Sequence, residues 1–102
     1  MYSYKTFYGD TFLDGIDMCK NNIKHLTELE YYKICTSVSK ESSPIYGIEV
    51  IKKKHFNDKI EEEVENVELL TKDEAAIDQI IQKLKENKVT PIGLKDVIQE
   101  LI

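Results

Sequence analysis

The sequence predicts an α+β domain, in which a small antiparallel sheet of three to four strands is covered on one face by a C-terminal two-helix hairpin. Three observations support this fold. Residues 29–53 alternate between apolar and polar positions with a period of two, two apolar stripes of helical spacing follow near the C-terminus, and only a short connection separates those stripes. A chain of 102 residues fits one domain, which we take as residues 1–102.

The C-terminal third contains the two predicted helices. Each carries one apolar stripe at positions i, i+3, i+4 and i+7, made by Ile77, Ile80, Ile81 and Leu84 in the first helix and by Leu94, Val97, Ile98 and Leu101 in the second. Two short amphipathic helices with about three residues between them fold back on each other, and together they cover an apolar surface.

The helix boundaries are predicted from capping residues. Thr71 followed by Glu74 fits a capping box at the start of the first helix, which we expect to end near Asn87 or Lys88. Thr90 and Pro91 predict the start of the second helix, with threonine at the N-cap and proline at the first helical position.

The middle of the chain predicts strands. Residues 31–38 and 45–53 both alternate, and the turn-rich residues 39–44 between them predict a β-hairpin from about Leu29 to Lys53. Residues 57–68 fit either a strand or a helix. We favour a third strand, because a two-stranded hairpin alone offers the helices too little surface.

The N-terminal segment is predicted to begin with a short strand that carries Tyr2 and Tyr4 on one face. Residues 11–26 then suggest a short helix, since apolar side chains recur in steps of four and three at Phe12, Ile16, Cys19, Ile23 and Leu26. Gly15 and the adjacent Asn21 and Asn22 weaken this helix.

Two motifs in residues 31–102 resemble a known family. The first is a Y-G-I-x-[IV] strand at Tyr46–Val50, and the second is a V-T-P-x-x-L-x-D-V helix start at Val89–Val97. Both are similar to motifs in a family of small bacterial proteins of unknown function that are common in spore-forming anaerobes. The resemblance implies the same fold, and it implies no catalytic residues.

Composition and charge limit the function classes. The net charge is −5; residues 1–56 contribute +1 and residues 57–102 contribute −6. All basic residues are lysines, and without arginine the chain lacks the bidentate fork that suits phosphate and guanine. No apolar run reaches the length of a membrane span and the N-terminus does not resemble a signal peptide, so we expect a cytoplasmic protein.

The residues that could carry chemistry are few. The soft and imidazole ligands are Cys19, His25, Cys35 and His55, and none forms the close pair typical of zinc sites. No sequence signature of a nucleophile, phosphate loop or dinucleotide fold is present. We therefore expect no catalytic residues, no metal and no cofactor, and we expect a non-enzymatic protein.

Two charge clusters have ordinary structural interpretations. Glu61, Glu62, Glu63, Glu65 and Glu68 are typical of a solvated edge strand, and Lys52–Lys54 of the soluble end of a strand. The second C-terminal helix presents Lys95, Asp96, Gln99 and Glu100, a poor set for reading DNA. The hairpin therefore fits a lid on a core better than a helix-turn-helix.

The function that remains is protein–protein interaction, as a small regulator or adaptor that binds another protein or itself. Tyrosine is enriched at interfaces, and the six tyrosines concentrate in the sheet half of the chain. The predicted interaction surface comprises Tyr31, Tyr46, Lys52, Lys53 and Lys54. The alternative is weak nucleic-acid binding through Lys52–Lys54, and a membrane partner is not expected.

Overall fold

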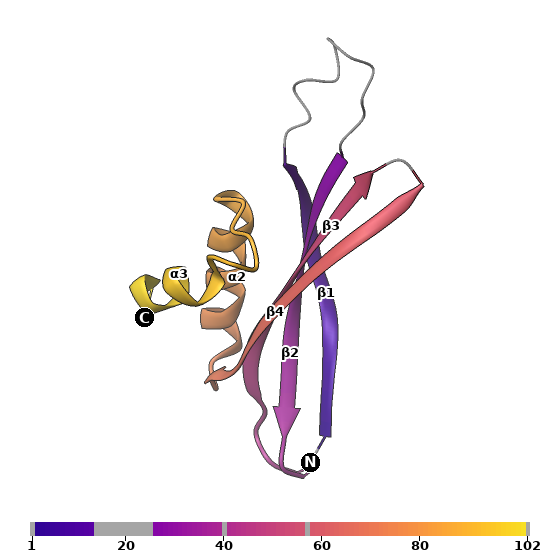
Figure 1. Cartoon of the computed structure of the whole chain (residues 1–102). Helices are drawn as coiled ribbons and strands as arrows, with labels where there is room; N and C mark the ends of the chain where they lie inside the picture. The colour runs from indigo at the N-terminus through magenta and orange to yellow at the C-terminus, as the bar shows by residue number, and fades with distance from the viewer. Residues whose placement is uncertain (1, 14–25, 40, 57, 102) are drawn as a thin grey trace.

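The computed structural model describes residues 2–13, 26–39, 41–56 and 58–101. Four strands form one antiparallel sheet in the order of the sequence: β1 (Tyr2–Leu13), β2 (Leu26–Ser37), β3 (Ile45–Phe56) and β4 (Lys59–Thr71). Two helices, α2 (Glu74–Glu86) and α3 (Leu94–Leu101), lie on one face of this sheet (Figure 1). The predicted fold class is therefore confirmed.

The molecule is elongated, with extents of 55 × 28 × 18 Å. A strand of 12 residues spans about 40 Å at roughly 3.3 Å per residue, whereas a helix of 13 residues spans about 20 Å. The helices therefore cover only part of the sheet, and the strands project beyond them (Figure 1). The other face of the sheet carries no helix within the described ranges.

The strand register separates the two faces of the sheet. Tyr31 of β2 lies opposite Val50 of β3, and Leu29 and Ile48 lie two residues from these on the same face. These four side chains are fully buried beneath the helices. The core is completed from the helix side by Ile77, Ile81, Leu84, Val89, Leu94 and Ile98.

Several predicted elements are confirmed. The β-hairpin expected at Leu29–Lys53 is present as β2 and β3, with both strands longer than predicted. Residues 59–71 form a strand, so the preference for a strand over a helix in this region is confirmed. Both apolar stripes near the C-terminus pack against the core, apart from Leu101, which is exposed. The first helix ends at its predicted position, with Asn87 as the C-cap.

The predicted helix starts are wrong by two residues for α2 and by three residues for α3. Thr71 is the last residue of β4, and the N-cap of α2 is Asp73, whose carboxylate accepts a hydrogen bond from the Ala75 amide at 3.0 Å. The Thr71 hydroxyl accepts a hydrogen bond from the Asp73 amide instead. Thr90 and Pro91 form a tight turn before α3, which begins only at Leu94.

The short helix predicted over residues 11–26 is wrong at both ends. Phe12 belongs to β1, where it pairs with Glu28, and Leu26 belongs to β2, where it pairs with His55. Strand pairing extends β1 to Leu13, and this tertiary effect overrides the helical spacing of the apolar side chains. The rest of the predicted helix lies outside the described residues.

No helix in the described ranges is both long enough and apolar enough to cross a bilayer.

Candidate functional site

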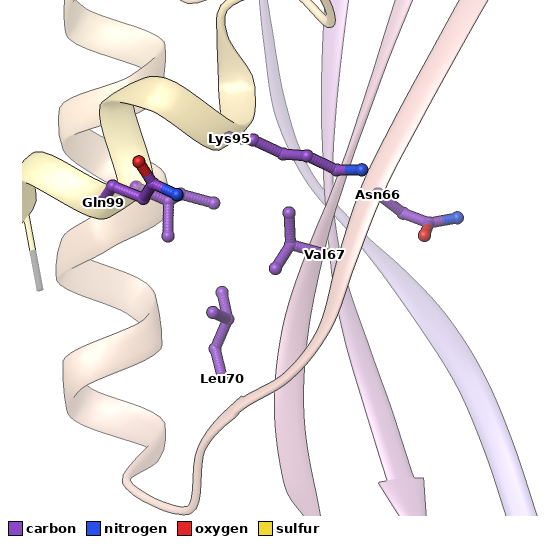
Figure 2. Close-up of a pocket in the computed structure, with 6 residues that line it drawn as sticks. Asn66, Val67, Leu70, Lys95 and Gln99 are labelled. Carbon is purple, nitrogen blue, oxygen red and sulfur yellow. The ribbon is translucent and has the colours of Figure 1, made fainter.

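An apolar groove runs between β4 and α3 (Figure 2). Its volume is about 600 Å³, and its walls are formed by Asn66, Val67 and Leu70 of β4 and by Lys95, Ile98 and Gln99 of α3. Val67 and Leu70 point into the space between β4 and α3, and Lys95 and Gln99 lie near its rim (Figure 2). The Asn66 side chain points to the other side of β4 (Figure 2). Apolar concavities with a few polar groups are the common form of a binding site.

An irregularity in β4 places two of the apolar wall residues on the same side. Val67 pairs with Ile48 and Thr71 with Tyr46, so three residues of β4 lie opposite Gly47 alone. Within this bulge Leu69 has a φ of 59°, and its side chain points to solvent with 59% exposure. The bulge resets the alternation of side chains, and Leu70 therefore joins Val67 in packing toward the helices.

The bulge is sterically possible because Gly47 has no side chain. A Cβ atom at this position would lie 2.4 Å from the Val67 carbonyl oxygen and 2.8 Å from the Glu68 Cα. Only glycine allows the two backbones to approach so closely. The glycine in the Tyr46–Val50 strand is thus a structural requirement of the groove wall.

The other wall depends on the orientation of α3. Leu94 and Ile98 are buried, and this turns Lys95 and Gln99 toward the rim of the groove. The Lys95 ammonium lies 3.8 Å from the Glu65 carboxylate of β4, so one ion pair bridges the two walls at the surface. Exposed pairs of this kind contribute little to stability.

The groove adjoins a free strand edge. β4 is the last strand in the sheet, and among the described residues no strand pairs with its outer side. Edge strands present unpaired backbone N–H and C=O groups. The six groove residues include no carboxylate, imidazole, hydroxyl or thiol, so their arrangement favours binding over chemistry.

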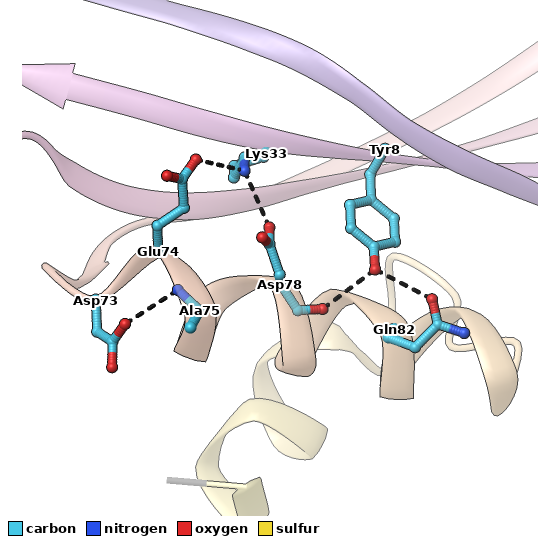
Figure 3. Close-up of polar contacts among 7 residues, drawn as sticks. All are labelled: Tyr8, Lys33, Asp73, Glu74, Ala75, Asp78 and Gln82. Atoms are coloured by element: carbon cyan, nitrogen blue, oxygen red, sulfur yellow. Dashed lines mark hydrogen bonds and ion pairs between the residues drawn. The ribbon is translucent and has the colours of Figure 1, made fainter.

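Apart from the groove, a cluster of polar contacts attaches α2 to the sheet (Figure 3). The Lys33 ammonium donates hydrogen bonds to Glu74 at 2.8 Å and to Asp78 at 3.0 Å, and the first of these bonds contributes most to raising the pKa of Lys33 to about 12. The Tyr8 hydroxyl lies 3.1 Å from Gln82 Oε1 and 3.3 Å from the Asp78 carbonyl oxygen. These contacts hold the helix on strands β1 and β2.

The structure does not bring the predicted interaction residues together. Tyr31 has no exposed surface, and its hydroxyl donates to the Val89 carbonyl at 2.9 Å, so it belongs to the core and offers nothing to a partner. Tyr46 is half-buried near the start of β3. Lys52 lies six residues along the same strand, a separation of about 20 Å at roughly 3.3 Å per residue.

The three lysines lie opposite three glutamates of the neighbouring strand. The register pairs Lys52 with Glu63, Lys53 with Glu62 and Lys54 with Glu61. The Lys53 ammonium is also 3.1 Å from Glu30 on its other side. This ladder of opposite charges lowers the positive potential that a phosphate backbone requires.

Two of the four metal-ligand candidates, Cys35 and His55, lie within the described residues. Cys35 is buried and carries a free thiol, and His55 lies 3.9 Å from the Glu28 carboxylate. Cys19 and His25 lie outside the described residues. Within the described ranges, no group of three or more histidine, cysteine, aspartate or glutamate side chains has the arrangement of a metal site.

Sequence patterns did not reveal the groove. Ile98 was recognisable only as part of the apolar stripe, and Val67 only as one of several apolar residues in an ambiguous segment. Gly47 was the available signal, because a glycine inside a strand marks a bulge or a close backbone approach.

Comparison with known proteins gives a family and no function. Residues 12–102 match the model of a family of unknown function, DUF6514, and the chain belongs to this family. The match covers both C-terminal helices, β2 to β4 and the groove between β4 and α3. Searches of curated proteins and of solved structures found no significant match.

Proposed function

We propose that this protein is a non-enzymatic protein-interaction module, a small cytoplasmic regulator or adaptor, and that the groove between β4 and α3 binds a segment of its partner. The observation that carries the proposal is the apolar groove lined by Val67, Leu70 and Ile98, beside a strand edge that no other described strand pairs with. Both features favour the same kind of ligand.

An extended segment fits this combination. Added beside β4, it gains backbone hydrogen bonds from the strand edge, and every second side chain points toward α3 and into the groove. Apolar side chains at those positions contact Val67, Leu70 and Ile98. The bulge around Leu69 interrupts regular pairing and limits the added strand to the residues that precede it.

The charge of β4 favours a basic partner. The strand carries five glutamates and one lysine, of which Glu61, Glu62 and Glu63 lie opposite lysines of β3. Pairing β4 with a second β4 would bring glutamates together, and like charges on neighbouring strands are destabilising. We therefore expect a different protein whose segment alternates apolar residues with lysine or arginine.

Nucleic-acid binding through Lys52–Lys54 has weaker support, because each of these lysines has a glutamate directly across the strand pair. A single-stranded oligonucleotide tested at low salt distinguishes the two functions. Binding that weakens steeply with added salt, and that is lost in Lys54→Glu, would favour the nucleic-acid function over the peptide function.

The peptide function is tested by selection from a displayed random-peptide library, followed by measurement of Kd for the enriched peptides. The groove variant is Gln99→Arg, which places a second positive charge beside Lys95, and the matched control is Gln79→Arg on the exposed face of α2. We expect alternating apolar and basic peptides that bind Gln99→Arg about tenfold or more weakly and bind the control unchanged. No enrichment, or equal binding to all three proteins, would overturn the proposal.

A further inference from the structure

The opposite edge of the sheet has a very different character from β4. β1 is 12 residues long and contains a single lysine, Lys5, and a single aspartate, Asp10. Its exposed aromatic side chains are Tyr2 (50%), Tyr4 (63%), Phe7 (51%) and Phe12 (47%). Within the described residues β2 is its only strand neighbour. A long, weakly charged and aromatic strand edge is a template for pairing with another chain.

A bulge gives this edge an unusual symmetry. Phe7 pairs with Tyr32 and Gly9 with Tyr31, so the register shifts at Tyr8. Such a shift reverses the alternation of side chains along the strand. Before the bulge Lys5 lies opposite Ile34, and after it Asp10 lies opposite Glu30.

Lys5 and Asp10 consequently share a face of the sheet. Ile34 and Glu30 are four residues apart in β2, so their side chains point the same way, toward the face that carries no helix. An odd separation of five residues would place Lys5 and Asp10 on opposite faces of a regular strand. The bulge therefore places both charges on the same face of the sheet. They lie at equal distances along the chain from the midpoint between Phe7 and Tyr8.

We propose that β1 is a self-association edge, at which two copies of this chain pair antiparallel with the twofold axis at the bulge. In this register Lys5 of each copy lies opposite Asp10 of the other, which gives two equivalent ion pairs. Tyr4 then lies opposite Thr11 of the second copy, and both residues belong to the helix-covered face. Residues 2–6 of each copy pair with residues 9–13 of the other, so that the four-stranded sheets join into one sheet of eight strands. At the axis Phe7 lies opposite Tyr8 of the second copy, and regular pairing is interrupted there because Tyr8 points to α2 and Phe7 to the other face.

The charges favour a second copy as the occupant of this edge. Shifting the register by two residues in either direction places Lys5 opposite Tyr8 or Phe12, so one register alone forms both ion pairs. The contact is isologous, which closes the assembly as a dimer. In one copy alone the Lys5 ammonium reaches across β2 to Glu49 of β3 at 2.6 Å, so a bond to Asp10 of the second copy replaces this contact.

This inference does not depend on the proposed peptide groove, because β1 and β4 are the two opposite edges of the sheet. A dimer through β1 leaves β4 and α3 free. Failure of one proposal therefore leaves the other in place.

The test is sedimentation equilibrium of the full chain from about 1 µM to about 300 µM protein, a range in which mass action reveals a weak dimer. Asp10→Lys places lysine opposite Lys5 at both symmetric positions. The double variant Lys5→Glu/Asp10→Lys restores the opposite charges in exchanged positions. Asp58→Lys, an exposed site with the same change of charge, is the matched control.

We expect the wild type and Asp58→Lys to approach twice the 11.9 kDa of one chain. Asp10→Lys should weaken the dimer about tenfold or more, and the double variant should recover most of that loss. Hydrogen exchange of the wild type gives a readout that needs no variant: amides of residues 2–13 should exchange more slowly at high protein concentration, and those of residues 59–67 should not change. A monomeric wild type, or a dimer that Asp10→Lys leaves intact, would overturn the proposal.

Discussion

The hydroxyl of Tyr31 donates a hydrogen bond to the backbone carbonyl of Val89 across the core, at a distance of 2.9 Å. Tyr31 lies in the middle of β2, and Val89 lies in the connection between the two helices, so one buried bond links the sheet to the helical layer. Both residues are buried, and the bond satisfies a carbonyl that has left water.

Replacing Tyr31 with phenylalanine should lower the free energy of unfolding by about 1 to 3 kcal/mol, because it leaves the Val89 carbonyl buried without a donor. The ring and its packing are retained. Urea denaturation monitored by circular dichroism measures the change. Tyr2→Phe, at an exposed site, serves as the control and should leave the midpoint unchanged.

The same residue makes the fold sensitive to alkaline pH. Burial raises the pKa of Tyr31 from 10.0 to about 12. The unfolded chain therefore loses this proton at a lower pH than the folded chain. The contribution of Tyr31 to the free energy of unfolding is fully present below pH 10. It is lost as the pH rises from 10 to about 12, which lowers the free energy of unfolding by about 2 to 3 kcal/mol.

Deprotonation of Lys33 also lowers the free energy of unfolding at alkaline pH, over a narrower pH range. Its pKa is raised from 10.5 to about 12, mainly by the hydrogen bond to Glu74, so its contribution also disappears as the pH rises between these values. Denaturation midpoints from pH 8 to 12 should fall in the wild type and fall less in Tyr31→Phe. Equal slopes for the two proteins would contradict the assignment to Tyr31.

The bulge beside the groove should be intolerant of any side chain at Gly47. Gly47→Ala places a methyl group against the Val67 carbonyl, and we expect a loss of about 1 to 3 kcal/mol together with disturbance of the groove wall. Gly93→Ala is the matched control, since its nearest neighbour would lie 4.0 Å from the new Cβ. Thermal melts of the two variants give the comparison, and similar Tm values would contradict the close approach.

The C-terminus of α2 offers a stabilising substitution. Lys88 has a φ of 52°, the Val89 amide bonds to the Leu84 carbonyl, and the Lys88 amide bonds to the Lys85 carbonyl. This is a Schellman motif with lysine at the position that favours glycine. Lys88→Gly should raise the free energy of unfolding by about 1 kcal/mol, because glycine adopts this conformation without strain. A lower Tm in this variant would be inconsistent with the left-handed cap.

The helices and the central hairpin were predictable from sequence because their apolar periodicity is strong and local. The helix starts were not, since Asp73 and Thr71 both bear side chains that can cap a helix, and the end of β4 decides between them. The N-terminal strand was largely missed because pairing with β2, a non-local contact, determines its length.

The candidate site was less predictable than the fold. The groove forms where β4 and α3 meet, and that meeting depends on the bulge opposite Gly47. The predicted interaction surface used residue types alone, and residue type does not distinguish the buried Tyr31 from an exposed tyrosine. Nor does it reveal that Lys52–Lys54 lie opposite Glu61–Glu63, which only the strand register determines.

The most direct measurement of the central claim is a ¹H–¹³C methyl NMR titration of the full chain with the tightest selected peptide. If the groove binds the partner segment, the methyl signals of Val67, Leu70 and Ile98 shift together, while those of Ile34 and Ile51 on the opposite face of the sheet remain in place. Shifts confined to that opposite face or to β1, with the groove methyls unmoved, would contradict the account.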